Sequence, residues 1–151
     1  YMDSGTQMSC GKDAAKMWLN FLHPSEKTDI KDANDLSAVI RLEYRGYSVL
    51  FTGDLGEDGE RELISEGDGL SADVLKVGHH GSRYSTSDEF LRAVDPDLAI
   101  ISAGKNNRYG HPHGETLDRL DACGANVMST IEHGAICVGI TDDGISVTGY
   151  R

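Results

Sequence analysis

The sequence predicts a mixed α/β fold, in which a β-sheet is flanked by helices. Three observations support this. A hairpin pattern runs through residues 37–51, apolar strands alternate with helix-like segments from residue 57 to 130, and a second hairpin pattern spans residues 135–150. In such folds ligands bind beyond the carboxyl ends of the strands. A chain of 151 residues is long enough for one domain with a real core.

The N-terminal third predicts a tail followed by a hairpin. Residues 1–17 are polar and aperiodic, and we expect a tail or the remnant of a larger domain, so that the main domain covers residues 18–151. A short apolar run ends at His23-Pro24, and residues 25–35 are charged and loop-like. Apolar and polar residues then alternate over residues 37–44, Arg45-Gly46 turns the chain, and residues 47–51 return.

Three helices follow from their start and stop signals. Residues 57–65 have Leu63 and Ile64 on one face and Gly67 as a stop. Thr86 and Glu89 stand three residues apart, which predicts a capping box for a helix that ends before Asp95-Pro96. Residues 114–123 precede Gly124, a typical C-terminal stop. The remaining apolar runs predict strands at 73–77, 98–102, 126–130, 135–140 and 145–150.

Composition excludes several classes of protein. No run approaches the roughly 20 apolar residues of a membrane helix, and the first residues do not have the pattern of a signal peptide. A net charge of −11 argues against a surface that coats nucleic acid. Cys10, Cys123 and Cys137 show no CxxC spacing, so we expect one tail thiol and a pair of small buried side chains, with a disulfide between Cys123 and Cys137 as the alternative.

Chemistry-bearing residues follow the strands. Asp54 ends a strand in Thr52-Gly53-Asp54, where a rigidly held carboxylate could bridge two divalent ions or simply cap the next loop. His79 and His80 leave the next strand between glycines. Adjacent side chains there point to opposite sides, so one imidazole can bind a metal while the other faces substrate; the alternative is a structural or surface pair.

The segment from Gly104 to His113 contains Lys105, Arg108 and two imidazoles but no acid. His111-Pro112-His113 opens a helix, whose N-terminus favours anions, so this loop is suited to a phosphate; a capped polar surface loop is the alternative. His23 and His133 are isolated and are interpreted as structural.

Together these segments resemble the metallo-β-lactamase-fold domain of ComEC-type competence (DNA-uptake) proteins. The resemblance runs from about residue 18 to 151 and rests on Thr52-Gly53-Asp54, on residues 73–82, on Ile101-Ser102 and on residues 106–113, with Leu22-His23-Pro24 and Asn34-Asp35-Leu36-Ser37 also fitting. It implies a four-layer αββα hydrolase with two divalent metals, zinc or manganese. It also implies a membrane-anchored, extracytoplasmic setting in a bacterial parent protein and nuclease action on phosphodiesters.

The resemblance also implies roles for individual residues. Asp54 would bridge the metals and His80 would bind the second metal. His79 and His111 would act on the scissile phosphate, with Ser82, Asn107 and His113 as substrate-binding candidates. Asn34 lies near a position where relatives place another histidine ligand.

One departure is large: no HxHxDH-type motif occurs in residues 1–33. We therefore expect the C-terminal half of an αββα sandwich, with too few metal ligands of its own and a sheet face without its partner layer. The expected partner is the missing N-terminal half or a second copy. Two alternatives to a phosphodiesterase remain: a non-catalytic assembly module, or an acyl or thioester hydrolase of the same fold.

Overall fold

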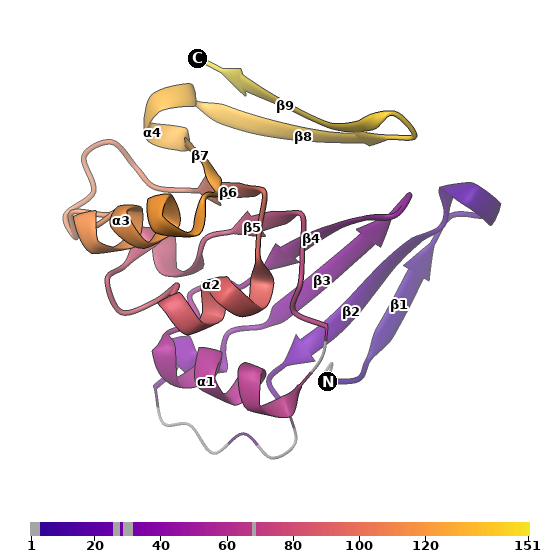
Figure 1. Ribbon diagram of the computed structural model, residues 1–151, viewed down its shortest axis with the longest axis horizontal. Helices are drawn as coiled ribbons and strands as arrows, with labels where there is room; N and C mark the ends of the chain where they lie inside the picture. The colour runs from indigo at the N-terminus through magenta and orange to yellow at the C-terminus, as the bar shows by residue number, and fades with distance from the viewer. Residues whose placement is uncertain (1–3, 26–27, 29–31, 68) are drawn as a thin grey trace.

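The computed structural model describes residues 4–25, 28, 32–67 and 69–151. Its main feature is a seven-stranded mixed sheet whose strands lie in chain order (Figure 1). β1 to β4 are antiparallel and β4 to β7 are parallel. The strands are β1 (Gln7–Cys10), β2 (Met17–His23), β3 (Val39–Tyr44), β4 (Tyr47–Phe51), β5 (Val74–Lys76), β6 (Leu98–Ile101) and β7 (Asn126–Ser129).

One face of this sheet is covered by helices α1 (Glu57–Glu66), α2 (Asp88–Val94) and α3 (Gly114–Cys123) (Figure 1). The core lies between them, because Leu50, Leu75 and Ala99 are opposite one another on adjacent strands and fully buried. Helix residues complete this core: Leu63, Phe90, Leu91, Val94 and Leu120. This confirms the mixed α/β class with flanking helices.

A short helix α4 (Thr130–His133) leads into the hairpin of β8 (Ala135–Thr141) and β9 (Gly144–Tyr150). The hairpin lies on the side of the sheet opposite to α1, α2 and α3 (Figure 1). A cavity of about 380 Å³ separates it from β3–β6 and is lined by residues that include Leu42, Val49, Ile136 and Val138. The hairpin therefore covers only part of this second face.

The second face is apolar both under the hairpin and beyond it. Cross-strand pairing places Met8, Leu19, Leu42 and Val49 in one row, and Phe21, Ile40 and Phe51 in the next. Met8 remains 45% exposed and Phe51 41% exposed. An apolar sheet face of this kind is normally packed against another layer, as we expected from the sequence.

Three details differ from the sequence predictions. β1 forms within the stretch that we expected to be a tail, and it pairs with β2. The N-cap of α2 is Ser87, whose Oγ accepts a hydrogen bond from the amide of Phe90. Thr86 cannot act as the cap because its φ of 58° is left-handed, whereas an N-cap has extended backbone. The expectation of buried cysteines is also wrong, since Cys10, Cys123 and Cys137 are free and exposed.

The predicted loop 25–35 falls partly outside the described residues, and so do the first three residues of the predicted tail. Among the described residues no helix is both long and apolar enough to cross a membrane.

Candidate functional site

Asp54 lies just beyond the carboxyl end of β4, at the edge of the sheet where β5 and β6 also end. Gly53 precedes it with a φ of +55°, and a Cβ there would approach the Cβ of Ser37 to 3.0 Å. The Asp54 amide donates to Ser37 Oγ at 3.1 Å. The glycine therefore permits a tight turn that fixes the position of the carboxylate.

His79 and His80 lie in a 3-10 turn, Gly78–Gly81, directly after β5. Both residues have left-handed backbone, with φ values of 45° and 57°. The turn is held in place because the His79 amide donates to the Gly53 carbonyl at 3.1 Å and the Ser82 amide donates to the His79 carbonyl at 3.0 Å. Two successive non-glycine residues in this region are strained, which is a common property of functional sites.

His80 is oriented toward Asp54. Its Nδ1 lies 2.7 Å from the carbonyl oxygen of Ser102, and since a carbonyl only accepts, Nδ1 carries the proton. The lone pair is then on Nε2, which lies 3.4 Å from Asp54 Oδ1. A histidine that donates one nitrogen to a backbone carbonyl and presents the other beside a carboxylate has the arrangement of a metal ligand.

Asp54 and His80 do not form a complete metal site by themselves. Among the described residues no group of three or more His, Cys, Asp or Glu side chains could hold a metal ion. Structural and catalytic zinc sites use three or four protein ligands. The pair fits part of a metal site, and the remaining ligands would have to come from elsewhere.

Four imidazoles gather at this edge. The ring of His111 lies 5.5 Å from His79, 6.4 Å from His80 and 4.8 Å from His113, measured between centroids. Burial lowers the pKa of His111 from its usual value near 6.5, the neighbouring imidazoles lower it further, and Asp54 opposes the shift. His111 is therefore neutral near pH 7, so one ring nitrogen can accept a proton and the other can donate a hydrogen bond.

The loop that carries His111 packs closely on the 78–81 turn. A Cβ at Gly81 would lie 2.7 Å from Pro112 Cβ, and Gly81 accepts a hydrogen bond from the His113 amide at 2.9 Å. His113 Nδ1 accepts from the amide of Arg83 at 3.1 Å. The two histidine-bearing loops thus support each other.

The predicted substrate-binding residues differ in accessibility. Ser82 is buried, and its Oγ accepts from the amide of Tyr84 at 3.3 Å. Asn107 uses its amide group within its own loop, donating to the carbonyls of Gly104 and His111 and accepting from the His111 amide. His113 is partly exposed beside His111. Their contact with substrate stays a prediction.

Two charged residues that the sequence analysis did not select hold the loop between β5 and α2, which carries His79 and His80. The carboxylate of Glu60, 1% exposed, accepts from the amides of Thr86 and Ser87. The guanidinium of Arg119 donates to the carbonyls of Ser85 at 2.8 Å and Thr86 at 2.9 Å. A carboxylate on a predicted surface helix gives no signal of burial, so only the structure identifies Glu60.

Lys76 also lies near the site, with its Nζ donating to the carbonyl of Val77 at 2.7 Å. Burial lowers the pKa of its ammonium group, and the nearby carboxylate of Asp54 counteracts that shift. The lysine therefore adds a cation to the same edge of the sheet.

Residues 29–105 match the model of the metallo-beta-lactamase superfamily, so the chain belongs to this superfamily. Its relatives are proteins of the ComEC type, as the motifs predicted. It is 46% identical to ComE operon protein 3 of Bacillus subtilis (strain 168) over 111 residues, which are 74% of this chain and 14% of that protein. It is 39% identical to competence protein ComA of Neisseria gonorrhoeae over 132 residues, 87% of this chain and 19% of that protein.

A third relative, recombination protein 2 of Haemophilus influenzae, is 38% identical over 118 residues, 78% of this chain and 15% of that protein. The chain therefore spans less than a fifth of the length of these curated relatives.

Proposed function

We propose that this chain is the C-terminal half of a metal-dependent hydrolase domain of ComEC type that acts on phosphodiesters, with DNA as the substrate of the whole protein. The observation that carries this proposal is the pairing of His80 Nε2 with Asp54 Oδ1 at 3.4 Å beside a cluster of imidazoles. The names of the relatives, which refer to competence and recombination, support a role in DNA uptake. The domain would then belong to a bacterial membrane protein and lie outside the cytoplasm.

Asp54 and His80 would hold divalent metal, with Asp54 bridging two ions of zinc or manganese. Such ions, when bound, supply a nucleophilic hydroxide from water and stabilise negative charge on phosphate oxygens. The hydrogen bond from His80 Nδ1 to Ser102 supports this role because, in the neutral ring, it leaves the lone pair on Nε2, the nitrogen that faces Asp54.

His79 and His111 would contact the scissile phosphodiester. Their rings lie 5.5 Å apart, so one phosphate group could contact both. The lowered pKa of His111 leaves its ring neutral near pH 7, so its N–H can donate a hydrogen bond to a phosphate oxygen and its other nitrogen can accept a proton from the attacking water. Lys105 and Arg108 on the same loop would draw the anion toward the site.

The other metal ligands would come from an N-terminal half that packs on the apolar face of β1–β4. The exposed side chains of Met8 and Phe51 support this partner. A second copy of the chain is the alternative occupant, and an assembly module without catalysis is the corresponding alternative function.

An acyl or thioester hydrolase of the same fold is less well supported. The acid-free loop that contains Lys105 and Arg108 favours a phosphate over a neutral ester. Hydrolysis of a thioester but not of a phosphodiester by the metal-loaded parent domain would reverse this preference.

The catalytic proposal is tested on a longer polypeptide that includes residues upstream of this chain. We expect it to bind zinc or manganese and to hydrolyse bis(p-nitrophenyl) phosphate. Asp54→Asn and His80→Gln should abolish both, whereas His133→Gln, whose ring contacts the carbonyl of Ser129 beside its own short helix, should affect neither. Metal binding and turnover that survive Asp54→Asn would contradict the assignment.

The assembly proposal is tested by size-exclusion chromatography with light scattering. An N-terminal half added to this chain should form a one-to-one complex, and Phe51→Glu should prevent it by placing a charge on the apolar face. A stable homodimer that does not bind the N-terminal half would favour the second copy as the partner. A monomer that forms neither a homodimer nor a complex with the N-terminal half would refute the idea that this face is an interface.

A further inference from the structure

Two hollows lie on either side of the histidine cluster, and they differ in charge. One, of about 480 Å³, contains His79 and is lined by four acids, Asp32, Asp35, Glu57 and Asp58, against one cation, Arg61. The other, of about 300 Å³, contains His80 and His111 and is lined by no acid. A polyanionic substrate that reaches the imidazoles would therefore leave through the second hollow, because carboxylates repel phosphate in the first.

The wall of the second hollow contains an exposed aromatic ring. Tyr109 is 60% exposed and lines the hollow together with His80 and His111. Its ring is stacked on His111, with centroids 5.7 Å apart and an interplanar angle of 23°. The guanidinium carbon of Arg108 lies 4.8 Å from the centre of the same ring.

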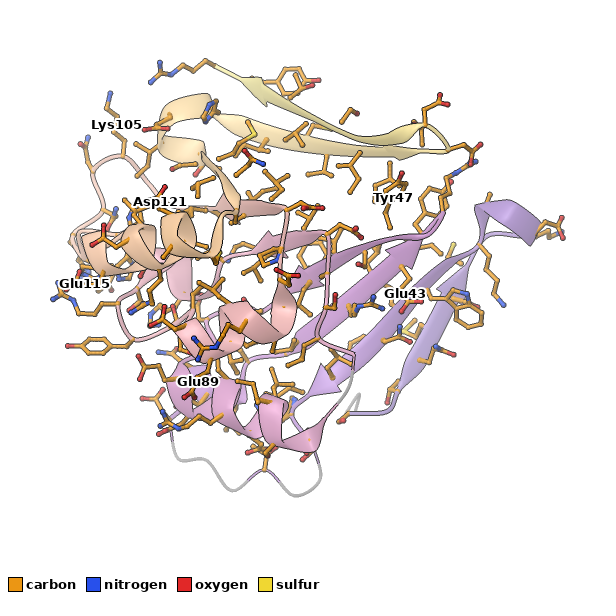
Figure 2. The ribbon with its side chains drawn as sticks, viewed as in Figure 1. Glu43, Tyr47, Glu89, Lys105, Glu115 and Asp121 are labelled. Carbon is orange, nitrogen blue, oxygen red and sulfur yellow. The ribbon has the colours of Figure 1, made fainter. Side chains whose placement is uncertain are left out.

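The backbone of the loop that carries this ring is held by hydrogen bonds. The side chain of Asn107 bonds to the carbonyls of Gly104 and His111 and to the His111 amide, so it joins the two ends of the segment that contains Tyr109. Lys105 extends from the same loop, away from the body of the molecule (Figure 2). A planar aromatic group is thus presented beside the imidazoles and next to the guanidinium of Arg108, on a loop that also carries Lys105.

From this arrangement we infer that Tyr109 forms a subsite for a nucleobase, the ring attached to the sugar next to the phosphodiester held by His79 and His111. Nucleobases stack on exposed aromatic side chains. A base that stacks on Tyr109 would displace the side chain of Arg108 from the ring, and the guanidinium could then contact the adjoining phosphate. A quaternary ammonium group would also favour an aromatic ring, but Arg108 lies against this one and repels it. The base must be unpaired to stack, so the substrate is single-stranded at this point.

This inference rests on the proposed function, and its test therefore measures binding of an oligonucleotide instead of hydrolysis of a phosphodiester. The probe is a fluorescently labelled oligothymidylate at low ionic strength, compared with an abasic strand of equal length and charge. Tyr109→Ala should weaken binding of the oligothymidylate about 10-fold and leave binding of the abasic strand unchanged. Tyr109→Phe, which keeps the ring, should bind like the unaltered protein.

The matched control is Tyr84→Ala, because Tyr84 is 71% exposed but lines the acidic hollow. It should bind both strands as the unaltered protein does. No binding of oligothymidylate, an equal loss for both strands, or the same loss in Tyr84→Ala would overturn the inference. Failure of the proposed function looks different: the metal-loaded parent domain would not hydrolyse phosphodiesters, while Tyr109-dependent binding would persist.

Discussion

Replacing Glu60 with glutamine tests whether a buried carboxylate holds the loop that carries His79 and His80. Glu60 is 1% exposed and accepts hydrogen bonds from the amides of Thr86 and Ser87. Glutamine keeps one acceptor oxygen and turns an NH₂ group toward the other amide. Leaving a buried donor without an acceptor costs about 1–3 kcal/mol in unfolding free energy.

The pH dependence gives this prediction a sign. Burial raises the pKa of Glu60 above its usual value near 4.5, against the opposing effect of its hydrogen bonds. A raised pKa in the folded state means that the contribution to stability is complete below the unfolded pKa and is lost as pH rises through the folded pKa. The glutamine variant does not titrate at this position, so its unfolding free energy has no such loss. The difference in unfolding free energy between the unaltered protein and the variant should therefore be largest near pH 4.5 and should become smaller toward neutral pH.

The assay is chemical denaturation of both proteins across this pH range, followed by the fluorescence of the single tryptophan, Trp18. The control is Glu89→Gln, an exposed glutamate on α2 (Figure 2), which should shift the unfolding free energy by less than about 0.5 kcal/mol. Equal stability of Glu60→Gln and the unaltered protein near pH 4.5, or a deficit that widens with pH, would refute the reasoning. The second result would mean that the hydrogen bonds outweigh burial and that the pKa of Glu60 is lowered.

Three further substitutions probe the supports of the site, each by denaturant titration. Gly81→Ala should lower the unfolding free energy by about 2–4 kcal/mol, because the new Cβ would lie 2.7 Å from Pro112 Cβ and the backbone φ is +84°. The control is Gly110→Ala, where φ is also positive but no atom lies close, and it should lower the unfolding free energy by only about 1–2 kcal/mol. Equal losses would show that contact with Pro112 is unimportant. Arg119→Lys should lower the unfolding free energy by about 1–2 kcal/mol, since an ammonium group cannot replace the planar guanidinium that donates to several loop carbonyls. Arg92→Lys, at an exposed position, should leave the unfolding free energy unchanged. Leu75→Ala, in the fully buried centre of the sheet, should lose about 2–5 kcal/mol, and a smaller loss would place the core elsewhere.

The strand and helix pattern could be predicted from the sequence because each element has a local signal. The turn at Arg45-Gly46, the stop at Gly124 and the buried strand before Gly78 all form where their residue types predict. The convergence of Asp54, His80 and His111 also follows from local information, since each comes after one of three adjacent strands or in the loop that leaves it.

Tertiary contacts decided the rest. Thr86 matches a capping box, but the carboxylate of Glu60 holds its amide and the left-handed backbone moves the cap to Ser87. The orientation of His80 depends on the carbonyl of Ser102, a backbone group with no sequence signature. Neither contact can be derived from the spacing of residue types.

The left-handed backbone at His79 and His80 has a consequence for how this protein can change. Glycine adopts that conformation without a steric penalty, so these are positions where the stability of the fold and the chemistry of the site favour different residues. A selection or library screened for thermal tolerance alone should accumulate glycine here and discard the imidazoles. Retention of both histidines in such an experiment would require a second selection, for the activity itself.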